Sequence, residues 1–341
     1  MSTTLPTTGR AWNLVRRPNG WPVPEDFDLV EFPVSEPAAG RILVRNLHLS
    51  VDPYMRGRMN DVKSYVPPFA LNEPMTGGAV GEVIATNDDR FAVGDHVLHD
   101  LGWRDYADVR ADYATKVDAS LAPLSTYLGV LGMPGLTAYA GLFEVASFKE
   151  GDTVFVSGAA GAVGSQVGQM AKLRGAKRVV GSAGSADKIK LLTESYGFDA
   201  AFNYKDEAPV VKQLREVAPE GIDVYFDNVG GEHLEAAIST LNVHGRATLC
   251  GAISGYNETE PVPGPRNMMS IIGKRLRLTG ILVGDHAHLK TQFVEEVSAW
   301  IRSGELKYDE TVVEGLENNV DAFLGMLRGH NTGKMIVSVG K

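Results

Sequence analysis

The distribution of apolar positions divides the chain near residue 126. Before that point, the segment 41–53 alternates apolar and polar residues, and 77–86 and 91–100 are further expected strands with glycine turns between them. Alternation with a period of two is typical of half-buried strands. The segment 61–75 contains three prolines, follows neither period and is expected to form a long loop. The first part of the chain is therefore predicted to be β-rich.

From residue 126 onward the period changes. Apolar runs of strand length alternate with segments whose apolar residues recur every three or four positions, as in amphipathic helices. The expected strands are 153–156, 177–184, 200–204, 222–231, 245–254 and 275–283, and the expected helices are 134–148, 165–176, 186–196, 208–218 and 232–241. Regular alternation of strand and helix predicts a doubly wound parallel sheet of the Rossmann type.

The two ends of the chain are less regular. Prolines between residues 18 and 37 indicate an irregular N-terminal hairpin. The last part is expected to contain a helix, a strand, a second helix and a second strand at 289–303, 306–313, 318–327 and 334–339. We interpret this tail as a return to the first domain. The prediction is an α/β fold in which a Rossmann domain (126–295) is inserted in a β-rich domain (1–125 and 296–341).

The segment 153–164 (TVFVSGAAGAVG) is the most informative stretch. An apolar run ends at Ser157, small residues follow as far as Gly164, and helical spacing begins directly afterwards. A strand, a tight turn and a helix place backbone N–H groups at the positive end of a helix dipole, where a pyrophosphate binds. Gly158, Gly161 and Gly164 depart from the G-x-G-x-x-G spacing, so a turn that binds nothing is the alternative. The context favours a dinucleotide site.

Composition narrows the class of protein. The 341 residues suggest about two domains, and a net charge of −9 without a Lys/Arg run argues against a nucleic-acid partner. The apolar runs are too short to span a membrane, and the N-terminal segment lacks the apolar core of a signal peptide. The single cysteine, Cys250, rules out an intramolecular disulfide, which fits a reducing compartment. A cytoplasmic location is expected.

The end of the second Rossmann strand bears on the choice of cofactor. NAD-preferring domains carry an acidic residue there, which binds the ribose 2′-hydroxyl. In this chain the strand ends in Val180, Gly181 and Ser182, and Lys188 lies at the start of the next helix. A missing acid and a nearby cation favour the 2′-phosphate of NADPH, although a lysine there is also typical of a solvated helix. The sequence predicts NADP(H) as cofactor.

Motifs spread along nearly the whole chain resemble a known family. They are VDPYMRGRM (51–59), EPMTGGAVGEV (73–83), GMPGLTAY (132–139), AAGAVGSQVGQMAK (159–172), FNYK (202–205), YFDNVGG (225–231), CGAISGYN (250–257) and NTGKMIV (331–337). Together they are similar to the zinc-independent alkenal/one oxidoreductases of the medium-chain dehydrogenase/reductase superfamily. That family includes prostaglandin reductase, plant double-bond reductases and bacterial curcumin reductase. The resemblance implies a GroES-like β-rich domain, NADP(H) and a homodimer.

The resemblance also implies which residues contact the cofactor. Lys188 and Tyr204 match the family's 2′-phosphate ligands, while Asn228 is equally typical of a turn that ends a strand. The full implied set is Pro134, Thr137, Ala160, Gly161, Ala162, Val163, Gly164, Lys188, Tyr204, Asn228, Cys250, Ala252, Ile253, Tyr256, Ile281, Leu282, Val283 and Asn331. Taken alone, Cys250 follows an apolar run, which indicates a buried and inert thiol.

The expected chemistry follows from the groups that are missing. Zinc dehydrogenases bind their metal through Cys and His, but this chain has VDPY (51–54) and GGA (77–79) at the corresponding positions. His48, His96 and His99 lie on expected strands, where histidine is more often structural than a ligand. No metal is therefore expected. Reduction of a C=C bond conjugated to a carbonyl needs only a hydride at the β-carbon, a hydrogen bond to the developing enolate and a proton at the α-carbon.

A tyrosine suits the last two tasks, since its hydroxyl donates a hydrogen bond while neutral at pH 7. Tyr54, Tyr65 and Tyr256 are the candidate substrate contacts, and the resemblance implies Tyr256 first and Tyr54 second as catalytic residues. Each of them, considered alone, is more typical of a packing residue than of a catalytic one, and water is an alternative proton donor. Arg56 and Arg58 either bind a substrate carboxylate, lie solvated or pair with a neighbouring aspartate.

Three functions are compatible with these residues. The favoured one is an NADPH-dependent reductase of α,β-unsaturated ketones and aldehydes, and the alternatives are a quinone reductase and a non-catalytic NADPH-binding protein. The segment 275–283 is apolar enough to pair with a second copy at a sheet edge, and equally suited to be a buried sixth strand.

Overall fold

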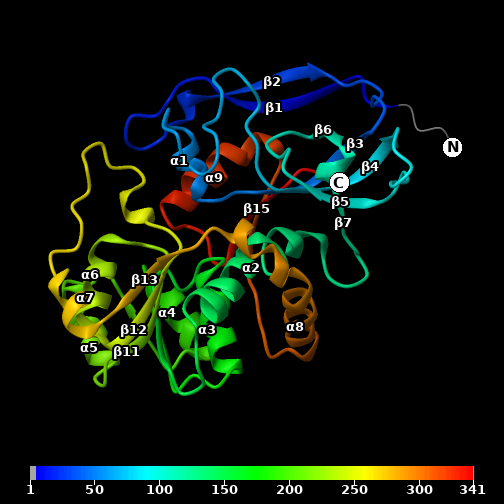
Figure 1. Cartoon of the computed structure of the whole chain (residues 1–341). Coiled ribbons are helices and arrows are strands. Elements are labelled where there is room, and N and C mark those ends of the chain that lie inside the picture. Colours follow the sequence, from blue (N-terminus) through cyan, green and yellow to red (C-terminus); the bar gives the residue numbers. More distant parts are fainter. Residues whose placement is uncertain (1–4, 341) are drawn as a thin grey trace. The chain divides into compact units, whose positions relative to one another are not determined.

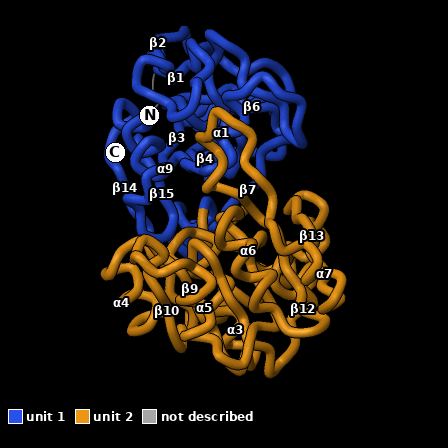
Figure 2. The backbone as a smooth tube through the Cα atoms, turned by 90° about the vertical axis from the view of Figure 1, so that its left-hand side faces the viewer, with its two compact units in different colours: residues 1–128, 310–341 blue, residues 129–309 orange. Residues whose placement is uncertain are grey.

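The computed structural model describes residues 5–340, which form two compact units (Figure 2). The first unit comprises residues 1–128 and 310–341, and the second comprises residues 129–309. The chain thus leaves the first unit, builds the second and returns. Within residues 5–340, no helix is long and apolar enough to cross a membrane.

The first unit is built around a seven-stranded sheet in the order β14-β15-β3-β4-β5-β7, with β6 paired to β3 (Figure 1). Its strands are β3 (Arg41–Ser50), β4 (Ala79–Thr86), β5 (His96–His99), β6 (Tyr106–Arg110), β7 (Thr115–Lys116), β14 (Glu310–Glu314) and β15 (Lys334–Ser338). β15 pairs antiparallel with β3, with Ile336 opposite Ser50. The C-terminal segment therefore completes the sheet that the N-terminal segment begins.

A separate antiparallel pair precedes this sheet. β1 (Thr8–Leu14) and β2 (Phe27–Pro33) stay in register from Thr8 opposite Pro33 to Leu14 opposite Phe27. The predicted N-terminal hairpin is confirmed, but its strands pair regularly, so the expected irregularity is wrong for the strands themselves. The irregular part is the connection 15–26, where prolines withhold backbone donors and a short 3-10 turn, Pro24–Asp26, leads into β2.

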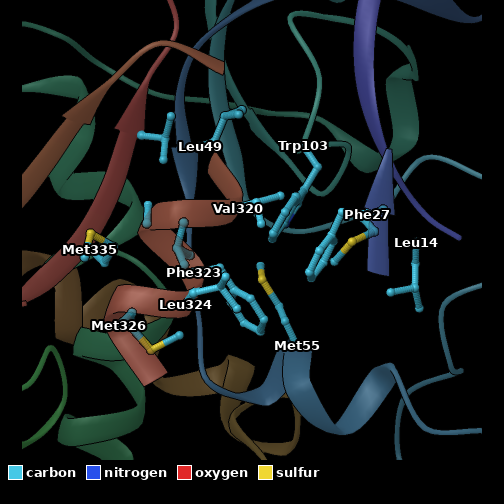
Figure 3. Packing of buried hydrophobic residues seen from close by; sticks show 14 of the residues in the cluster. Leu14, Phe27, Leu49, Met55, Trp103, Val320, Phe323, Leu324, Met326 and Met335 are labelled. Carbon is cyan, nitrogen blue, oxygen red and sulfur yellow. The ribbon is translucent and has the colours of Figure 1, made fainter. Parts of the chain in front are cut away.

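The core of the first unit gathers around Trp103. Phe27 stacks on the Trp103 ring at a centroid distance of 6.2 Å, and Phe323 of α9 (Asn319–Leu327) meets that ring edge-on at 5.8 Å (Figure 3). Met55 of α1 (Tyr54–Arg58) is fully buried in the same cluster. A Cβ on Gly77 would lie 2.4 Å from Cε of Met55, so glycine at that position makes room for it. Packing of Met55 thus anchors the helix that carries Tyr54.

The second unit confirms the predicted Rossmann fold. Its six strands run parallel in the order β10-β9-β8-β11-β12-β13. They are β8 (Thr153–Val156), β9 (Arg178–Ala183), β10 (Ala200–Asn203), β11 (Ile222–Asp227), β12 (Leu241–Leu249) and β13 (Arg277–Gly280). The strand order reverses between β8 and β11, and such a switch point is where doubly wound sheets bind ligands.

Helices connect these strands and cover the sheet. They are α2 (Met133–Ala140), α3 (Gly164–Leu173), α4 (Ala186–Glu194), α5 (Val210–Val217), α6 (Gly231–Thr240), α7 (Met269–Lys274) and α8 (Lys290–Ser303). α5 and α6 share one apolar cluster with Phe155 and Tyr225 of the sheet. β13 is shorter than the predicted 275–283, because Arg275 adopts a left-handed φ of 54° at the end of α7 and the strand starts only after it.

Candidate functional site

The glycine turn joins β8 to α3. Gly158 has a φ of 59°, and its carbonyl oxygen accepts a hydrogen bond from Gly161 N–H at 3.1 Å. A Cβ on Gly164 would lie 2.5 Å from the Gly158 oxygen and 2.8 Å from Cα of Ala159. Only glycine permits this approach of the helix start to the strand end. The turn has the small residues and the helix N-terminus that a pyrophosphate site requires.

Asp227 organises the opposite side of the switch point. Its side chain is buried and accepts hydrogen bonds from the Tyr225 hydroxyl (2.7 Å) and from the N–H groups of Val229 and Gly230 (2.9 and 2.7 Å). Burial raises the pKa of Asp227, and these hydrogen bonds oppose that rise. Asp227 is not among the site residues predicted from the sequence. An acidic residue between an apolar strand and a Gly-Gly turn was the signal available.

Asn228 bridges the two strands of the switch point. Its backbone N–H donates to the Ser157 hydroxyl at 3.0 Å, and its side-chain amide donates to the Ser157 carbonyl at 2.8 Å. Asn228 therefore has the turn-forming role that its position after β11 suggested. The cofactor contact that the resemblance implies for Asn228 stays a prediction.

Tyr256 ends the 3-10 turn Ile253–Gly255 that follows β12. The Ala252 N–H points at its hydroxyl from 3.4 Å, and a Cβ on Gly251 would lie 3.3 Å from both that hydroxyl oxygen and the Asn228 carbonyl oxygen. The structure thus brings the Tyr256 hydroxyl and Asn228 to the same end of the sheet. Burial raises the pKa of the nearby Cys250 thiol to about 12, so this thiol is protonated and poorly nucleophilic at neutral pH.

Lys188 and Tyr204 lie at the carboxyl ends of two neighbouring strands. β9 and β10 are paired, with Ala183 opposite Asn203, so the residues after them share one edge of the sheet. A Cβ on Gly184 would lie 2.9 Å from the Tyr204 hydroxyl oxygen. The backbone N–H of Lys188 donates to the Ser185 hydroxyl, the N-cap of α4, at 3.4 Å. This edge holds a cation and a hydroxyl donor, and the acid typical of an NAD site is missing from the end of β9.

The other predicted cofactor contacts are distributed over both units. Pro134 and Thr137 are buried on α2, and the Thr137 hydroxyl donates to the Met133 carbonyl at 2.7 Å. Ile281, Leu282 and Val283 follow β13 directly, and Ala160, Ala162, Val163, Ala252 and Ile253 belong to the two turns described above. Asn331 belongs to the first unit, where its amide donates to the Gly333 carbonyl at 2.7 Å. Their roles toward a cofactor stay predictions.

Tyr54 and Tyr65 belong to the first unit. Tyr54 is half-buried at the start of α1, and burial together with the negative charge of Asp52 raises its pKa well above the usual value, while Arg58 opposes the rise. Its hydroxyl is therefore neutral and able to donate a hydrogen bond at pH 7. Tyr65 is 65% exposed within the loop 61–75, which contains neither helix nor strand, as predicted.

The two arginines of α1 are held by the protein itself. Arg58 donates to the Pro67 carbonyl (3.0 Å) and the Thr76 hydroxyl (2.9 Å), and its guanidinium lies 4.0 Å from the centre of the Phe69 ring. It therefore ties the long loop to α1. Arg56 is buried, which excludes the solvated alternative for this residue, and it donates to the Gly20 carbonyl at 2.8 Å.

A buried ion pair underlies the segment that leads into α1. Lys334 Nζ lies 3.0 Å from Asp52 Oδ1 and 2.6 Å from the Val51 carbonyl oxygen, and both side chains are less than a tenth exposed. The Ser50 hydroxyl donates to the other oxygen of Asp52. Asp52 belongs to the stretch VDPY (51–54) that was expected to stand in place of a first zinc ligand, and its carboxylate pairs with a lysine. Sequence reasoning missed this pair because its members are 282 residues apart.

No group of three or more Cys, His, Asp or Glu side chains suited to a metal ion is found within residues 5–340. His99 is buried with both ring nitrogens bonded, Nε2 to the Asn46 side-chain oxygen at 2.9 Å and Nδ1 to the Leu101 N–H at 3.1 Å. Burial lowers the pKa of His99 to about 3. The structural role expected for histidine on these strands is confirmed for His99.

A doubly wound sheet with a glycine turn at its switch point, inserted in a β-rich unit, defines a dinucleotide-binding oxidoreductase of the medium-chain type. Two family descriptions match the chain, "N-terminal domain of oxidoreductase" over residues 10–117 and "Zinc-binding dehydrogenase" over residues 162–300. The chain belongs to the alkenal/one oxidoreductase family of the medium-chain dehydrogenase/reductase superfamily. Relatives more than 40% identical over nearly its whole length establish this membership.

Three comparisons carry the assignment. The NADPH-dependent curcumin reductase of Escherichia coli (strain K12) is 42% identical over 335 residues, covering 97% of this chain and 96% of the relative. The NADP(+)-dependent 2-alkenal reductase of Nicotiana tabacum is 44% identical over 328 residues, covering 94% and 95%. The crystal structure of CurA from Vibrio vulnificus in complex with NADPH is 42% identical, with a TM-score of 0.92 and coverage of 97% and 99%.

Proposed function

We propose that this protein is an NADPH-dependent reductase of the C=C bond in α,β-unsaturated ketones and aldehydes. The observation that carries the proposal is the near-full-length identity with a 2-alkenal reductase and a curcumin reductase. The basic edge after β9 and β10 supports the choice of NADPH over NADH. The negative charge of the 2′-phosphate favours a contact with the Lys188 ammonium group, and the Tyr204 hydroxyl adds an uncharged hydrogen-bond donor.

The residues of the second unit fit this cofactor. Glycine at position 164 lets the N-terminus of α3 approach the end of β8, because a Cβ there would lie 2.5 Å from the Gly158 carbonyl oxygen, and the helix N-terminus favours an anion. When bound, NADPH supplies the hydride that reaches the β-carbon of the substrate. The protein has to position that carbon, exclude water and stabilise the enolate that develops on the substrate oxygen.

We assign the enolate-stabilising hydrogen bond to the hydroxyl of Tyr256. This hydroxyl lies at the end of β12, beside the backbone of Gly251 and Ala252, on the edge of the sheet that carries the glycine turn. A neutral phenol can donate to the enolate oxygen and can also deliver the proton that the α-carbon requires. Tyr54 is proposed as a substrate contact from the first unit, since its raised pKa also keeps it neutral.

The proposal is tested by steady-state turnover on a panel of 2-alkenals, enones and quinones, with NADPH and with NADH. We expect NADPH oxidation with the alkenals and enones and lower rates with NADH. Faster turnover of quinones would favour a quinone reductase, and tight NADPH binding without any turnover would favour a non-catalytic protein. In the same panel, Tyr256→Phe should lower kcat about 100-fold, as expected for loss of a general acid. An unchanged kcat would reject tyrosine as the donor and favour water.

We also infer a homodimer in the cytoplasm. β13 is an edge strand of the parallel sheet, and Met269 (75% exposed) and Ile272 (69%) of the preceding helix α7 present apolar side chains near that edge. An open edge beside exposed apolar residues suits pairing with a second copy. Sedimentation at a molecular mass of one chain would contradict the dimer.

The cytoplasmic location rests on the single cysteine and is tested by cell fractionation.

A further inference from the structure

A second lysine lies at the edge of the sheet that carries Lys188 and Tyr204. Lys205 follows Tyr204 after β10, and a Cβ on Gly184 would lie only 3.1 Å from its Cε atom. The same Cβ would lie 2.9 Å from the Tyr204 hydroxyl oxygen, so both side chains lie close to the Gly184 backbone. The Lys205 side chain therefore lies against the end of β9 instead of extending away from it.

Lys205 is also close enough to Lys188 for their charges to interact. Burial lowers the pKa of Lys188, and the positive charge of Lys205 lowers it further. Two cations held together repel each other unless an anion lies between them. The acidic neighbour of Lys205 in the sequence, Asp206, accepts a hydrogen bond from the Asn203 side chain at 2.9 Å. The arrangement therefore suits a doubly charged anion.

The turn that carries Lys205 is well defined. Its backbone N–H donates to the Asn203 side-chain oxygen at 3.2 Å, and the Tyr204 N–H donates to the Ala183 carbonyl at 3.2 Å. These bonds tie the end of β10 to the end of β9. They hold Lys205 at the same edge of the sheet as the start of α4, where Lys188 is located. These backbone bonds therefore fix where the Lys205 side chain starts.

We propose that Lys205 is the second cation of the 2′-phosphate site and a determinant of the preference for NADPH over NADH. The proposal rests on the proposed function, since it requires NADP(H) at this edge of the sheet. Lys188 and Lys205 would hold the phosphate dianion from two sides, and the Tyr204 hydroxyl would donate to it. Gly184 contributes to the same 2′-phosphate site, because any side chain there would displace Tyr204 and Lys205.

The test measures nucleotide binding by the full-length protein without turnover. Isothermal titration calorimetry with 2′,5′-ADP and with 5′-AMP separates the contribution of the 2′-phosphate from that of the adenosine. Lys205→Gln should weaken 2′,5′-ADP binding about fivefold, leave 5′-AMP binding unchanged and reduce the salt dependence of 2′,5′-ADP binding, since one partly exposed charge contact is lost. Lys205→Arg should retain most of the affinity.

Lys190→Gln is the matched control. Lys190 lies on the same helix as Lys188, and its exposed side chain pairs with Glu194 at 3.8 Å. This variant should bind both nucleotides like the wild type. Equal 2′,5′-ADP affinity of wild type and Lys205→Gln would overturn the role of Lys205 while leaving NADPH as the cofactor. A wild type that binds 5′-AMP as tightly as 2′,5′-ADP would instead overturn the proposed cofactor preference itself.

Discussion

The two units place their polar groups in different ways. In the Rossmann unit, the polar groups of the candidate site lie at strand ends and part of their bonding is short-range, such as the bonds from Val229 and Gly230 to Asp227. In the β-rich unit, charged groups are buried within the fold, as Asp52 and Lys334 are. A turn at a strand end can be built from neighbouring residues, whereas a buried pair needs partners that only the complete fold brings together.

This difference predicts a large loss of stability when the buried pair is broken on one side. Lys334→Met removes the cation and leaves the Asp52 carboxylate buried without its partner. We expect the free energy of unfolding to fall by about 3–5 kcal/mol, because an unpaired buried charge is expensive. Urea denaturation measures this change. The double variant Asp52→Asn/Lys334→Met should recover much of it, and equal losses in the single and double variants would contradict the pairing argument.

A substitution in the glycine turn should lower the free energy of unfolding less than the loss of Lys334 does, and should weaken NADPH binding as well. Gly164→Ala places a Cβ 2.5 Å from the Gly158 carbonyl oxygen, so α3 must shift away from β8. We expect a loss of about 2–3 kcal/mol in unfolding free energy, typical of overpacking, together with weaker NADPH binding in fluorescence titrations. Gly264→Ala is the control, since its added Cβ meets no atom within 4 Å. Unchanged NADPH affinity in Gly164→Ala would argue against a pyrophosphate site at this turn.

Lowering the pH should reduce the free energy of unfolding by a smaller amount. His99 is buried with a pKa lowered to about 3, whereas the unfolded chain has the ordinary value of 6.5. The unfolded state therefore binds a proton below pH 6.5 that the folded state does not, and stability falls as the pH drops from 6.5 toward 3. By pH 5 the loss amounts to about 2 kcal/mol.

Denaturation of the wild type and of His99→Gln between pH 8 and pH 5 checks this effect. The variant should lose less stability across that range than the wild type. His244→Gln serves as the control, because His244 is exposed. The unfolding free energy of this variant should change with pH as that of the wild type does. Parallel curves for wild type and His99→Gln would show that His99 does not contribute.

Much of the second unit could be predicted from the sequence. Each parallel strand from β8 to β13 overlaps a strand expected from the sequence. The signal is clearest for β8, β9 and β11, which are buried along nearly their whole length, because strands buried on both faces are largely apolar. The glycine turn was predicted for a similar reason, since its geometry depends on consecutive small residues. Lys205 was passed over although it lies in the FNYK motif, because its relevance comes from a contact above Gly184 that spacing does not reveal.

The first unit was harder to predict. The regular pairing of β1 with β2 was obscured by the prolines between them, which belong to the connection and not to the strands. The role of Arg58 depends on Pro67, Phe69 and Thr76, which meet it only because the loop folds back over α1. Local propensity carries no information about such contacts.

The sequence by itself determined the alternation of strands and helices, the glycine turn and the missing acid after β9, because each depends on residues that are neighbours along the chain. Tertiary structure decided which charges meet. It pairs Lys334 with Asp52, brings Lys205 beside Lys188 and gathers Met55 and Phe323 around Trp103. These contacts join segments far apart in the chain, so their energies depend on burial and distance, which exist only once the chain has folded.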